Sequence, residues 1–557
     1  MCGINAIVGK VTNSDVRISS MNKSLKHRGP DFQGSFISDN FALGHTRLSI
    51  IDLSISGNQP MSSDCNKHHL IFNGEVINYK DIQKEYFPDL IPVNDSYIVL
   101  QSLMKYGSEW CIENFRGMFA FFFVNEQTNE YILGRDKFGI KPLYYSEAEK
   151  NIVISSEING ILSSGLVEQK INNKQIYNYF SERHVKAPNT LYEKIYQVIP
   201  GETIIWKNNI KTSKVNRDLT GDSNLDISLD ELIENTIKSW SISDVKVGTY
   251  LSGGLDSSLI SAILKKHVKS LESWCALFEE KGFDESMYAE KVAKSNNISL
   301  NKIILTYDEF LESTEDLILK KGLPLSVPNE ISLTEISKSM KGDIVVALSG
   351  EGADELFGGY DRIMSQEEGN AADFFNTYNY VPENILLSLG INIDEKITSH
   401  KLFNEVQGGY QSKVFNYFRK YHLEGLLMRV DFASMQNSIE TRPCFVDVDL
   451  FKYVTNNYPL QSLFDEKVGK KPLKEIAENF LDKEIVYRKK IGFPVPLNSF
   501  YKKTLSSIRK LINHSNIINK DKFENSLISI LETHNFGQIL WMILNLLIWE
   551  KQITNNK

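Results

Sequence analysis

The second residue of the chain is a cysteine, a residue type that can act as a nucleophile at this position. Removal of the initiator Met1, which a residue as small as cysteine permits, would leave the α-amino group of Cys2 free. An α-amine titrates near about 8 and a thiol near about 8.5, so the amine can accept the thiol proton close to neutral pH. Nucleophile and base would then lie on one residue. Taken alone, a cysteine here is more often buried and inert.

A second candidate site begins with the loop SGGLDSS, Ser252–Ser258. Its small residues would let backbone N–H groups close on a phosphate, and a helix starting there would add positive potential. The spacing differs from GxxxxGK[ST], so the loop is not a Walker-type site. Its glycines could also serve only a tight turn. Another polar loop, SGEGADELFGGY, occupies Ser349–Tyr360.

Two kinds of secondary structure must position these residues. Residues 1–206 contain short strand-like runs punctuated by Gly, Asn, Asp and Pro, such as INAIVG, HLIFNGEV and MFAFFFV, which predict stacked antiparallel sheet. Residues 207–225 are polar and predict a linker or a surface strand. Residues 226–557 first alternate strand and helix, which predicts a doubly wound parallel sheet with ligands beyond the carboxyl ends of its strands. The last ~150 residues predict added helices, ending in a buried one.

Composition narrows the class of protein. The 557 residues include 62 Lys+Arg and 70 Asp+Glu, a net charge of -8, which provides no general attraction for nucleic acid. No apolar run approaches the ~20 residues of a membrane span, and the start lacks the features of a signal peptide. The five cysteines are scattered and odd in number, which argues against disulfides and structural zinc. We expect a cytoplasmic enzyme with neither a nucleic-acid nor a membrane partner.

Four further segments lead to a family resemblance. They are HRGPD (27–31), GHTRLSIID (44–52), FNGEVIN (72–78) and RDKFGIKPLYY (135–145). With Cys2, they resemble the glutaminase domain of class II glutamine amidotransferases, which are N-terminal-nucleophile hydrolases. The resemblance spans nearly all of 1–206 and implies an α+β sandwich with layers αββα.

This resemblance implies a glutamine site. Arg47 would bind the α-carboxylate as a bidentate fork, and Glu75 and Asp95 would bind the α-ammonium. Asn73 and the backbone N–H of Gly74 would stabilise the oxyanion formed when Cys2 attacks the side-chain amide. Asp95 lies in NDSY, where the family more usually has an SDTE-like run. The full set of expected glutamine-binding residues is Arg47, Leu48, Ser49, Ile50, Ile51, Asn73, Gly74, Glu75 and Asp95.

The two loops of the second half resemble the synthetase domain of glutamine-hydrolysing asparagine synthetases. That family splits ATP between its α and β phosphates to make an acyl-adenylate. Glu351 would accept the proton that ammonium loses. Alternatively, the carboxylates of Glu351 and Asp354 would serve only to cap the N-terminus of a helix. The expected ATP-binding residues are Leu251, Ser252, Gly253, Gly254, Asp256, Ser257, Ala276, Ser349 and Gly350.

The same resemblance implies Mg²⁺ and a phosphate-binding lysine. Asp256 and Asp354 would be the magnesium ligands, because this cation prefers carboxylate and phosphate oxygens. Within YRKKIGFPVPL (487–497), Lys490 would stabilise charge on the transferring phosphate, and Lys489 is the alternative residue for this role. A third interpretation is that these basic residues are only solvated surface charges. A homodimer is also plausible from the resemblance.

The acceptor is the open question. Aspartate is the default, but TRPCFVD (441–447) and LPLSVPNEIS (323–332) depart from the usual family pattern near the expected acceptor site. The first alternative is therefore the same chemistry on another carboxylate, such as a uronic-acid sugar or a peptide precursor. A β-lactam-forming enzyme would need no ammonia, so the intact set around Cys2 argues against it. A non-catalytic glutamine sensor should have lost some of these reacting groups.

Overall fold

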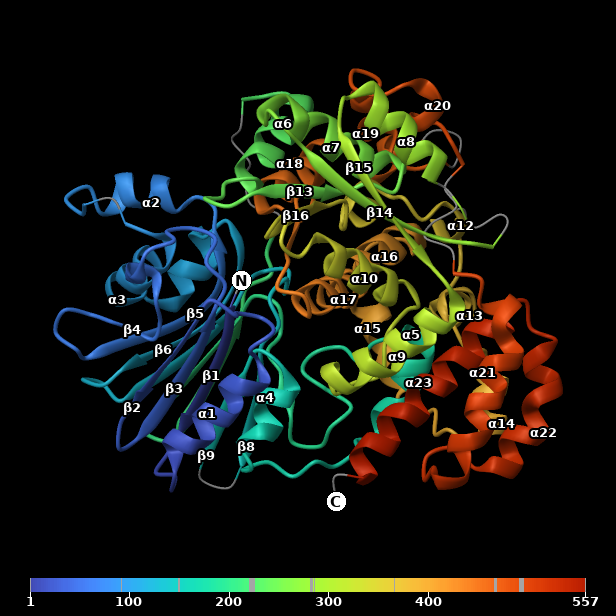
Figure 1. Cartoon of the computed structure of the whole chain (residues 1–557), viewed down its shortest axis with the longest axis horizontal. Helices are drawn as coiled ribbons and strands as arrows, with labels where there is room; N and C mark the ends of the chain where they lie inside the picture. Colours follow the sequence, from blue (N-terminus) through green and yellow to red (C-terminus); the bar gives the residue numbers. More distant parts are fainter. Residues whose placement is uncertain are drawn as a thin grey trace.

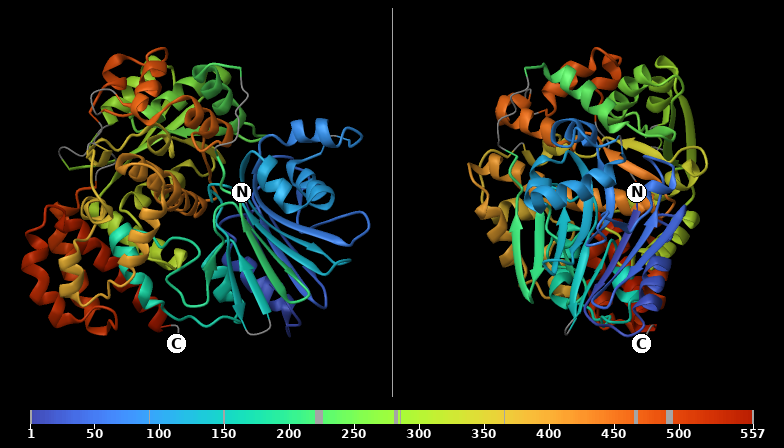
Figure 2. Two further views of the ribbon diagram at one scale, coloured as in Figure 1. Left: turned by 180° about the vertical axis from the view of Figure 1, so that it is seen from behind. Right: turned by 90° about the vertical axis from the view of Figure 1, so that its left-hand side faces the viewer.

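The computed structural model describes residues 2–91, 93–148, 151–219, 226–280, 284, 286–364, 366–464, 468–489 and 495–555. In this part of the chain, an N-terminal domain of antiparallel sheet and a C-terminal domain of parallel sheet and helices lie side by side (Figures 1 and 2). The amino terminus lies where the two domains meet. The two-domain architecture expected from the sequence is confirmed.

Two six-stranded antiparallel sheets form the described N-terminal domain. In spatial order, the first contains β10 (Tyr196–Gln197), β8 (Tyr144–Ala148), β9 (Asn151–Ser155), β1 (Cys2–Val8), β3 (Phe41–Arg47) and β2 (Phe32–Ile37). The second contains β12 (Ile210–Val215), β11 (Glu202–Lys207), β7 (Glu130–Arg135), β6 (Gly117–Asn125), β5 (His68–Val76) and β4 (Met61–Ser62).

Strand β6 shows why the sheets stack. Successive side chains of a strand point to opposite faces, and β6 is apolar at nearly every position. Phe119 and Phe121 pack with helix residues on the outer face, whereas Ala120 and Phe122 pack against the first sheet. Helices α2 (Tyr79–Tyr86) and α3 (Asp95–Asn114) cover the second sheet, and α1 (Ser14–Ser24) and α4 (Ile158–Ser163) the first. The layers are helix, sheet, sheet and helix.

The polar segment expected to be a linker or a surface strand is partly a surface strand. Residues 210–215, within the polar segment 207–225, form β12 and pair with β11 along its whole length. All six residues of β12 are exposed, because it is an edge strand whose side chains face solvent. Its composition therefore resembles that of a loop, and the sheet extends beyond residue 206. Residues 220–225 lie outside the described part of the chain.

The C-terminal sheet is parallel throughout. Its order is β15 (Ser299–Leu305), β14 (Glu272–Phe278), β13 (Val247–Tyr250), β16 (Val346–Ser349) and β17 (Glu440–Pro443). The chain runs outward from β13 in one direction and from β16 in the other, so the order reverses between these two strands. In such sheets, ligands bind at this switch point, beyond the carboxyl ends of the strands.

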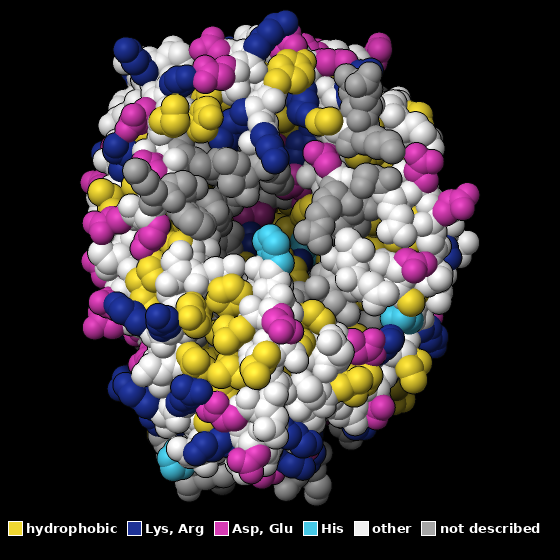
Figure 3. Space-filling model, turned by 90° about the vertical axis from the view of Figure 1, so that its right-hand side faces the viewer, with side chains coloured by type: hydrophobic (Ala, Val, Ile, Leu, Met, Phe, Trp, Pro, Cys, Tyr) yellow, Lys and Arg dark blue, Asp and Glu magenta, His cyan; other side chains and the backbone are white. Residues whose placement is uncertain are grey.

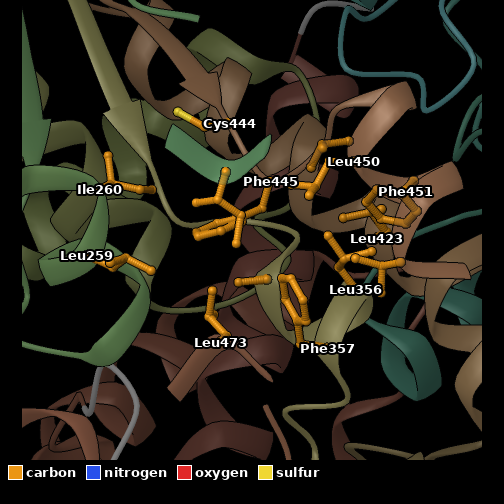
Figure 4. Packing of buried hydrophobic residues seen from close by; sticks show 14 of the residues in the cluster. Leu259, Ile260, Leu356, Phe357, Leu423, Cys444, Phe445, Leu450, Phe451 and Leu473 are labelled. Carbon is orange, nitrogen blue, oxygen red and sulfur yellow. The ribbon is translucent and has the colours of Figure 1, made fainter. Parts of the chain in front are cut away.

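Helices pack on both faces of the parallel sheet. Helices α7 (Leu255–His267) and α8 (Ser286–Ser295) cover one face, and α10 (Asn329–Met340) and α17 (Leu423–Met435) the other. Figure 4 shows part of the main core, in which Leu259 and Ile260 of α7 lie near Phe445 and Leu473. This core continues into the helical region that follows the sheet, so the added helices share one packed interior with it.

The remaining helices belong mostly to that region. They are α5 (Ile176–Glu182), α6 (Leu229–Trp240), α9 (Tyr307–Lys321), α11 (Ala353–Phe357), α12 (Asp361–Met364), α13 (Ala371–Tyr378), α14 (Glu383–Leu389), α15 (Lys396–Glu405), α16 (Tyr410–Tyr417), α18 (Val448–Asn457), α19 (Lys471–Ala477), α20 (Lys483–Val486), α21 (Leu497–Leu511), α22 (Lys520–Leu531) and α23 (Phe536–Asn555). The apolar α23 packs as a buried helix against α21, as expected. Among the described helices, none is both long and apolar enough to cross a bilayer.

Candidate functional site

Cys2 begins strand β1, at the face where the domains meet. It pairs in register with Arg47 of β3, so the two antiparallel strands bring the candidate nucleophile beside the candidate carboxylate-binding residue. The Cys2 backbone nitrogen donates a hydrogen bond to Asn73 Oδ1 at 2.9 Å. Burial raises the pKa of the Cys2 thiol, although the Leu48 backbone and Arg47 act in the opposite direction. Ionising this thiol therefore requires a nearby base.

Asn73 and Gly74, in β5, supply two hydrogen-bond donors beside Cys2. Asn73 Nδ2 is buried and, among the described residues, has no hydrogen-bond partner. Such a donor is costly to leave unpaired, so it is suited to a ligand oxygen. Gly74 has φ +154, and a Cβ there would lie 2.1 Å from the Met118 carbonyl oxygen. The strand can thus follow this path only with glycine.

The loop after β3 fixes Arg47. Its Nη1 donates to the Ser54 carbonyl at 2.7 Å and to Asn58 Oδ1 at 2.8 Å, and Nη2 donates to the Asp52 carbonyl. Expected residues that line one small cavity here are Cys2, Arg47, Leu48, Ile50, Ile51, Gly74, Glu75 and Asp95. Ser49 and Asn73 are not part of this lining; the backbone N–H of Ser49 donates to Asp31 Oδ2 at 2.8 Å, and Asn73 Oδ1 accepts from the Cys2 nitrogen.

Three buried carboxylates, Glu75, Asp95 and Glu440, lie at or beside this cavity, and one guanidinium of the other domain contacts two of them. Arg442, in β17 of the other domain, donates to Glu75 Oε2 at 2.8 Å and to Glu440 Oε1 at 2.6 Å. Burial raises the pKa of Glu75, and the neighbouring Glu440 and Asp95 raise it further, against the effect of Arg442. Burial also raises the pKa of Asp95, to about 6. The pocket therefore has more buried negative than positive charge, which favours a cationic ligand group.

The second site is a cavity of about 1560 Å³ at the carboxyl ends of β13 and β16. Figure 3 shows a hollow near the middle of one face of the molecule. Expected nucleotide residues that line the cavity are Leu251, Ser252, Gly254, Asp256, Ser257, Ser349 and Gly350. Gly253 and Ala276 do not line it. Gly253 makes the turn at φ +72, where a Cβ would lie 2.5 Å from the Ala289 nitrogen, and Cys275 faces the cavity instead of Ala276.

Asp256 and Asp354 converge on one lysine that the sequence did not reveal. Lys470 Nζ lies 2.7 and 2.6 Å from the two Asp256 carboxylate oxygens and 2.8 Å from Asp354 Oδ1. Burial acts to lower the pKa of Lys470, but the two carboxylates raise it above its ordinary value. Paired carboxylates beside a phosphate-sized space suit Mg²⁺. The described residues contain no cluster of three His, Cys, Asp or Glu ligands, so phosphate would have to complete the coordination.

Glu351 lies on the wall of the same cavity. Arg429, in α17, donates to Glu351 Oε1 at 2.9 Å and to Asn329 Oδ1 at 3.3 Å. The expected lysine Lys490 lies outside the described residues. Its alternative Lys489 lines the cavity, as does Arg488.

Helix α17 lies between the two sites. Arg28, from the N-terminal domain, donates to the Cys2 carbonyl at 3.1 Å and to Asp431 of α17 at 2.9 Å. Residues two apart on a helix point in different directions. Asp431 therefore faces the Cys2 site, whereas Arg429 holds Glu351. A cavity of about 80 Å³ with a mainly apolar wall lies beside this helix, and Tyr144, Leu191 and Phe432 contribute to its lining.

The residues that the sequence did not reveal depend on long-range contacts. Arg442 was visible only as part of TRPCFVD, and Lys470 only as one of two adjacent lysines within the region predicted to be mainly helical. The residue types around Arg442 do not distinguish it from a surface charge. The signal that could have identified Lys470 is the proline at residue 472, which favours a helix start and so an N-terminal position for the lysine.

The comparisons with known proteins identify the class and then the family. A model of the glutamine amidotransferase domain matches residues 1–216. The asparagine synthase model matches residues 228–551, and the chain belongs to this family.

Three curated relatives match about two thirds of this chain or more. Asparagine synthetase [glutamine-hydrolyzing] 1 of Bacillus subtilis is 28% identical, covering 99% of this chain and 96% of the relative. Asparagine synthetase [glutamine-hydrolyzing] 3 of the same organism is 26% identical, covering 92% and 90%. Amidase chry2 of Gibberella zeae is 29% identical, covering 66% of this chain and 60% of that protein.

Proposed function

We propose that this protein is an ATP-dependent amidotransferase, which takes ammonia from glutamine at Cys2 and transfers it to an acyl-adenylate in the C-terminal domain. The products would be an amide, AMP, pyrophosphate and glutamate. The observation that carries this proposal is the pair of sites on two sides of α17: Cys2 with its unpaired amide donor, and Glu351 with the nucleotide loops.

In the first half-reaction, the Cys2 thiolate attacks the side-chain carbonyl carbon of glutamine. Asn73 Nδ2 and the Gly74 N–H stabilise the oxyanion of the tetrahedral intermediate. Its collapse expels ammonia and leaves a thioester, which water hydrolyses to glutamate. Arg47 binds the α-carboxylate, and Glu75 with Asp95 binds the α-ammonium. The excess of buried negative charge supports this orientation.

The base for this step is the α-amino group of Cys2, freed by removal of Met1. Met1 lies outside the described residues. The hydrogen bond between the Cys2 nitrogen and Asn73 Oδ1 supports this role, because it would orient the amine beside the thiol. The raised thiol pKa makes such a base necessary.

In the second half-reaction, a carboxylate oxygen of the acceptor attacks the α-phosphorus of ATP, and pyrophosphate leaves. The backbone N–H groups of the Ser252 loop would bind phosphate oxygens at the N-terminus of α7. Asp256 and Asp354 would hold Mg²⁺, which when bound offsets charge on the phosphates. Lys470 and the basic segment at Lys489 and Lys490 would bind the released pyrophosphate and the transferring phosphate.

Ammonia then attacks the acyl carbon, and AMP leaves. Glu351 accepts the proton that the attacking nitrogen loses. Arg429 holds this carboxylate in place, and α17 connects it to the contacts of Cys2. Ammonia would have to cross between the domains in an apolar environment to stay neutral; the mainly apolar cavity of about 80 Å³ beside α17 would form part of such a route, although neither Cys2 nor Glu351 lines it.

The default acceptor is aspartate, which would yield asparagine. Another carboxylate is the second candidate, supported by the large cavity and by a relative that is named an amidase. Incubation with ATP, glutamine and aspartate, followed by mass spectrometry of the products, tests the default. Asparagine and AMP in equal amounts support it. Intact glutamine hydrolysis without asparagine would favour the other carboxylates.

A further inference from the structure

The large cavity has an aromatic wall in addition to its nucleotide loops. The rings are Tyr360, Tyr378, Tyr380, Phe418 and His422. Phe418 and His422 begin and end a π-helical turn, Phe418–His422, a rare backbone form that often marks functional sites. The volume of about 1560 Å³ also exceeds the roughly 300–1,000 Å³ of common small-molecule sites, so there is room beside a nucleotide for a second ligand.

Arg183 projects into this wall from the end of α5. It occupies the left-handed conformation, φ +70, which glycine usually adopts at a helix end. A non-glycine residue there is uncommon, and such backbone strain is concentrated at ligand sites. Arg183 lines both the large cavity and the cavity between the domains, so it lies at their common wall.

Neutral groups hold the guanidinium of Arg183. Nη1 donates to the Tyr380 hydroxyl at 2.6 Å, and the guanidinium lies 3.9 Å from the centre of that ring. Nη2 donates to His422 Nδ1 at 3.2 Å. Among the described residues, no carboxylate side chain lies within ion-pair distance of Arg183 or of Arg47, the arginine expected to bind the α-carboxylate of glutamine. Four other arginines each contact at least one carboxylate: Arg28, Arg116, Arg429 and Arg442.

We propose that Arg183 binds an anionic group of the acceptor, distinct from the carboxylate that becomes the amide. The proposal rests on the function proposed above. The acceptor is then a compound with at least two anionic groups, one at the nucleotide and one at Arg183. The body of the acceptor lies against the aromatic wall between them. Arg183 is the residue that selects such acceptors over molecules with a single carboxylate.

The first test measures binding without turnover. Wild-type protein with Mg²⁺ and a non-hydrolysable ATP analogue is titrated calorimetrically with matched pairs: succinate and butyrate, adipate and hexanoate, terephthalate and benzoate. At least one dicarboxylate should bind about 10- to 100-fold more tightly than its partner, as expected for a charge-assisted contact. The Arg183→Gln variant should lose this difference, and Arg183→Lys should retain part of it.

The matched control is Arg509→Gln, which removes an exposed arginine paired with Glu524 far along the chain. It should bind every probe as the wild type does. The proposal is overturned if no dicarboxylate binds wild-type protein better than its partner, or if Arg183→Gln binds dicarboxylates unchanged. Retained glutamine hydrolysis in Arg183→Gln reports that the variant is folded.

The second test separates this proposal from the proposed function. For any acceptor that gives AMP, Arg183→Gln should raise the acceptor KM by about 10- to 100-fold and leave the KM for ATP and for glutamine unchanged. An unchanged acceptor KM would overturn the role of Arg183. Absence of AMP with every acceptor, despite the binding difference, would instead refute the amidotransferase function.

Discussion

Arg442 Nη2 lies 2.8 Å from Glu75 Oε2, although 367 residues separate them in the chain. Arg442 belongs to β17 and pairs in register with Leu348 of β16, directly before the Ser349 loop. One strand of the C-terminal sheet therefore contacts a residue of the Cys2 cavity and lies beside the start of the Ser349 loop. Arg442, whose side chain is fully buried, thus lies between the two candidate sites.

Replacing Arg442 should impair the use of glutamine more than the use of ammonium. Arg442→Lys keeps the charge but loses the fork that reaches both Glu75 and Glu440. Loss of one charge-assisted contact predicts a fall in kcat/KM for glutamine of about 10- to 100-fold. Steady-state assays with glutamine and with ammonium chloride measure this. An equal loss with both nitrogen donors would indicate general damage to the fold instead.

Replacing Cys2 should separate the two chemistries. Cys2→Ala removes the nucleophile, so glutamine-dependent synthesis should fall below detection. Synthesis with added ammonium should remain near the wild-type rate, because no synthetase residue is changed. Amide formation with each donor is the measurement. Loss of both activities would contradict the existence of two separate sites.

Glutamine hydrolysis should decline in acid. Asp95 must be ionised to bind the α-ammonium, and its pKa in the free protein is about 6, raised by burial. As pH falls through this value the carboxylate becomes neutral, so kcat/KM for glutamine should drop by about tenfold per pH unit. Glu75, whose pKa is also raised, contributes to the same loss of kcat/KM on the acid side of the pH profile. The measurement is the pH profile of glutaminase kcat/KM, and Asp95→Asn should be weak at every pH. A flat profile between about pH 5 and pH 8 would be inconsistent with these roles.

Replacing Asp256 should affect only the nucleotide half of the reaction. Asp256→Asn removes a carboxylate that would ligate Mg²⁺, so ATP–pyrophosphate exchange should fall by at least about 100-fold. Glutamine hydrolysis should stay measurable, because Asp256 lies in the other domain. The variant also loses an ion pair with Lys470, so thermal unfolding should be recorded as a control. Exchange at the wild-type rate would exclude the metal role.

Local sequence pattern was enough to predict the elements that carry Cys2 and Ser252. The apolar run before Ser252 predicted β13, and the helical spacing of apolar residues after it predicted α7. Both patterns can be read from a short stretch of neighbouring residues. Strand β12 lies in the segment predicted to be a linker or a surface strand, and the sequence could not decide between them, since an exposed edge strand has the composition of a loop. Residues 440–443 gave no clear strand signal, yet β17 completes the sheet.

The long-range pairings of charged residues, within the C-terminal domain and between the domains, could not be predicted from one sequence. Lys470 contacts Asp256 across 214 residues, and Arg28 contacts Asp431 across 403. Each of these charged residues would more often be solvated, and only the fold pairs them. Arg183 is similar, because its importance depends on the wall around it and not on its neighbours in the chain.

The most direct test of the account follows the nitrogen. The protein is incubated with ATP, acceptor and glutamine that carries an isotope label on its amide nitrogen, in the presence of unlabelled ammonium, and the products are weighed by mass spectrometry. The account predicts a labelled amide formed together with one AMP and one glutamate. Unlabelled amide alone, or ADP in place of AMP, would contradict it.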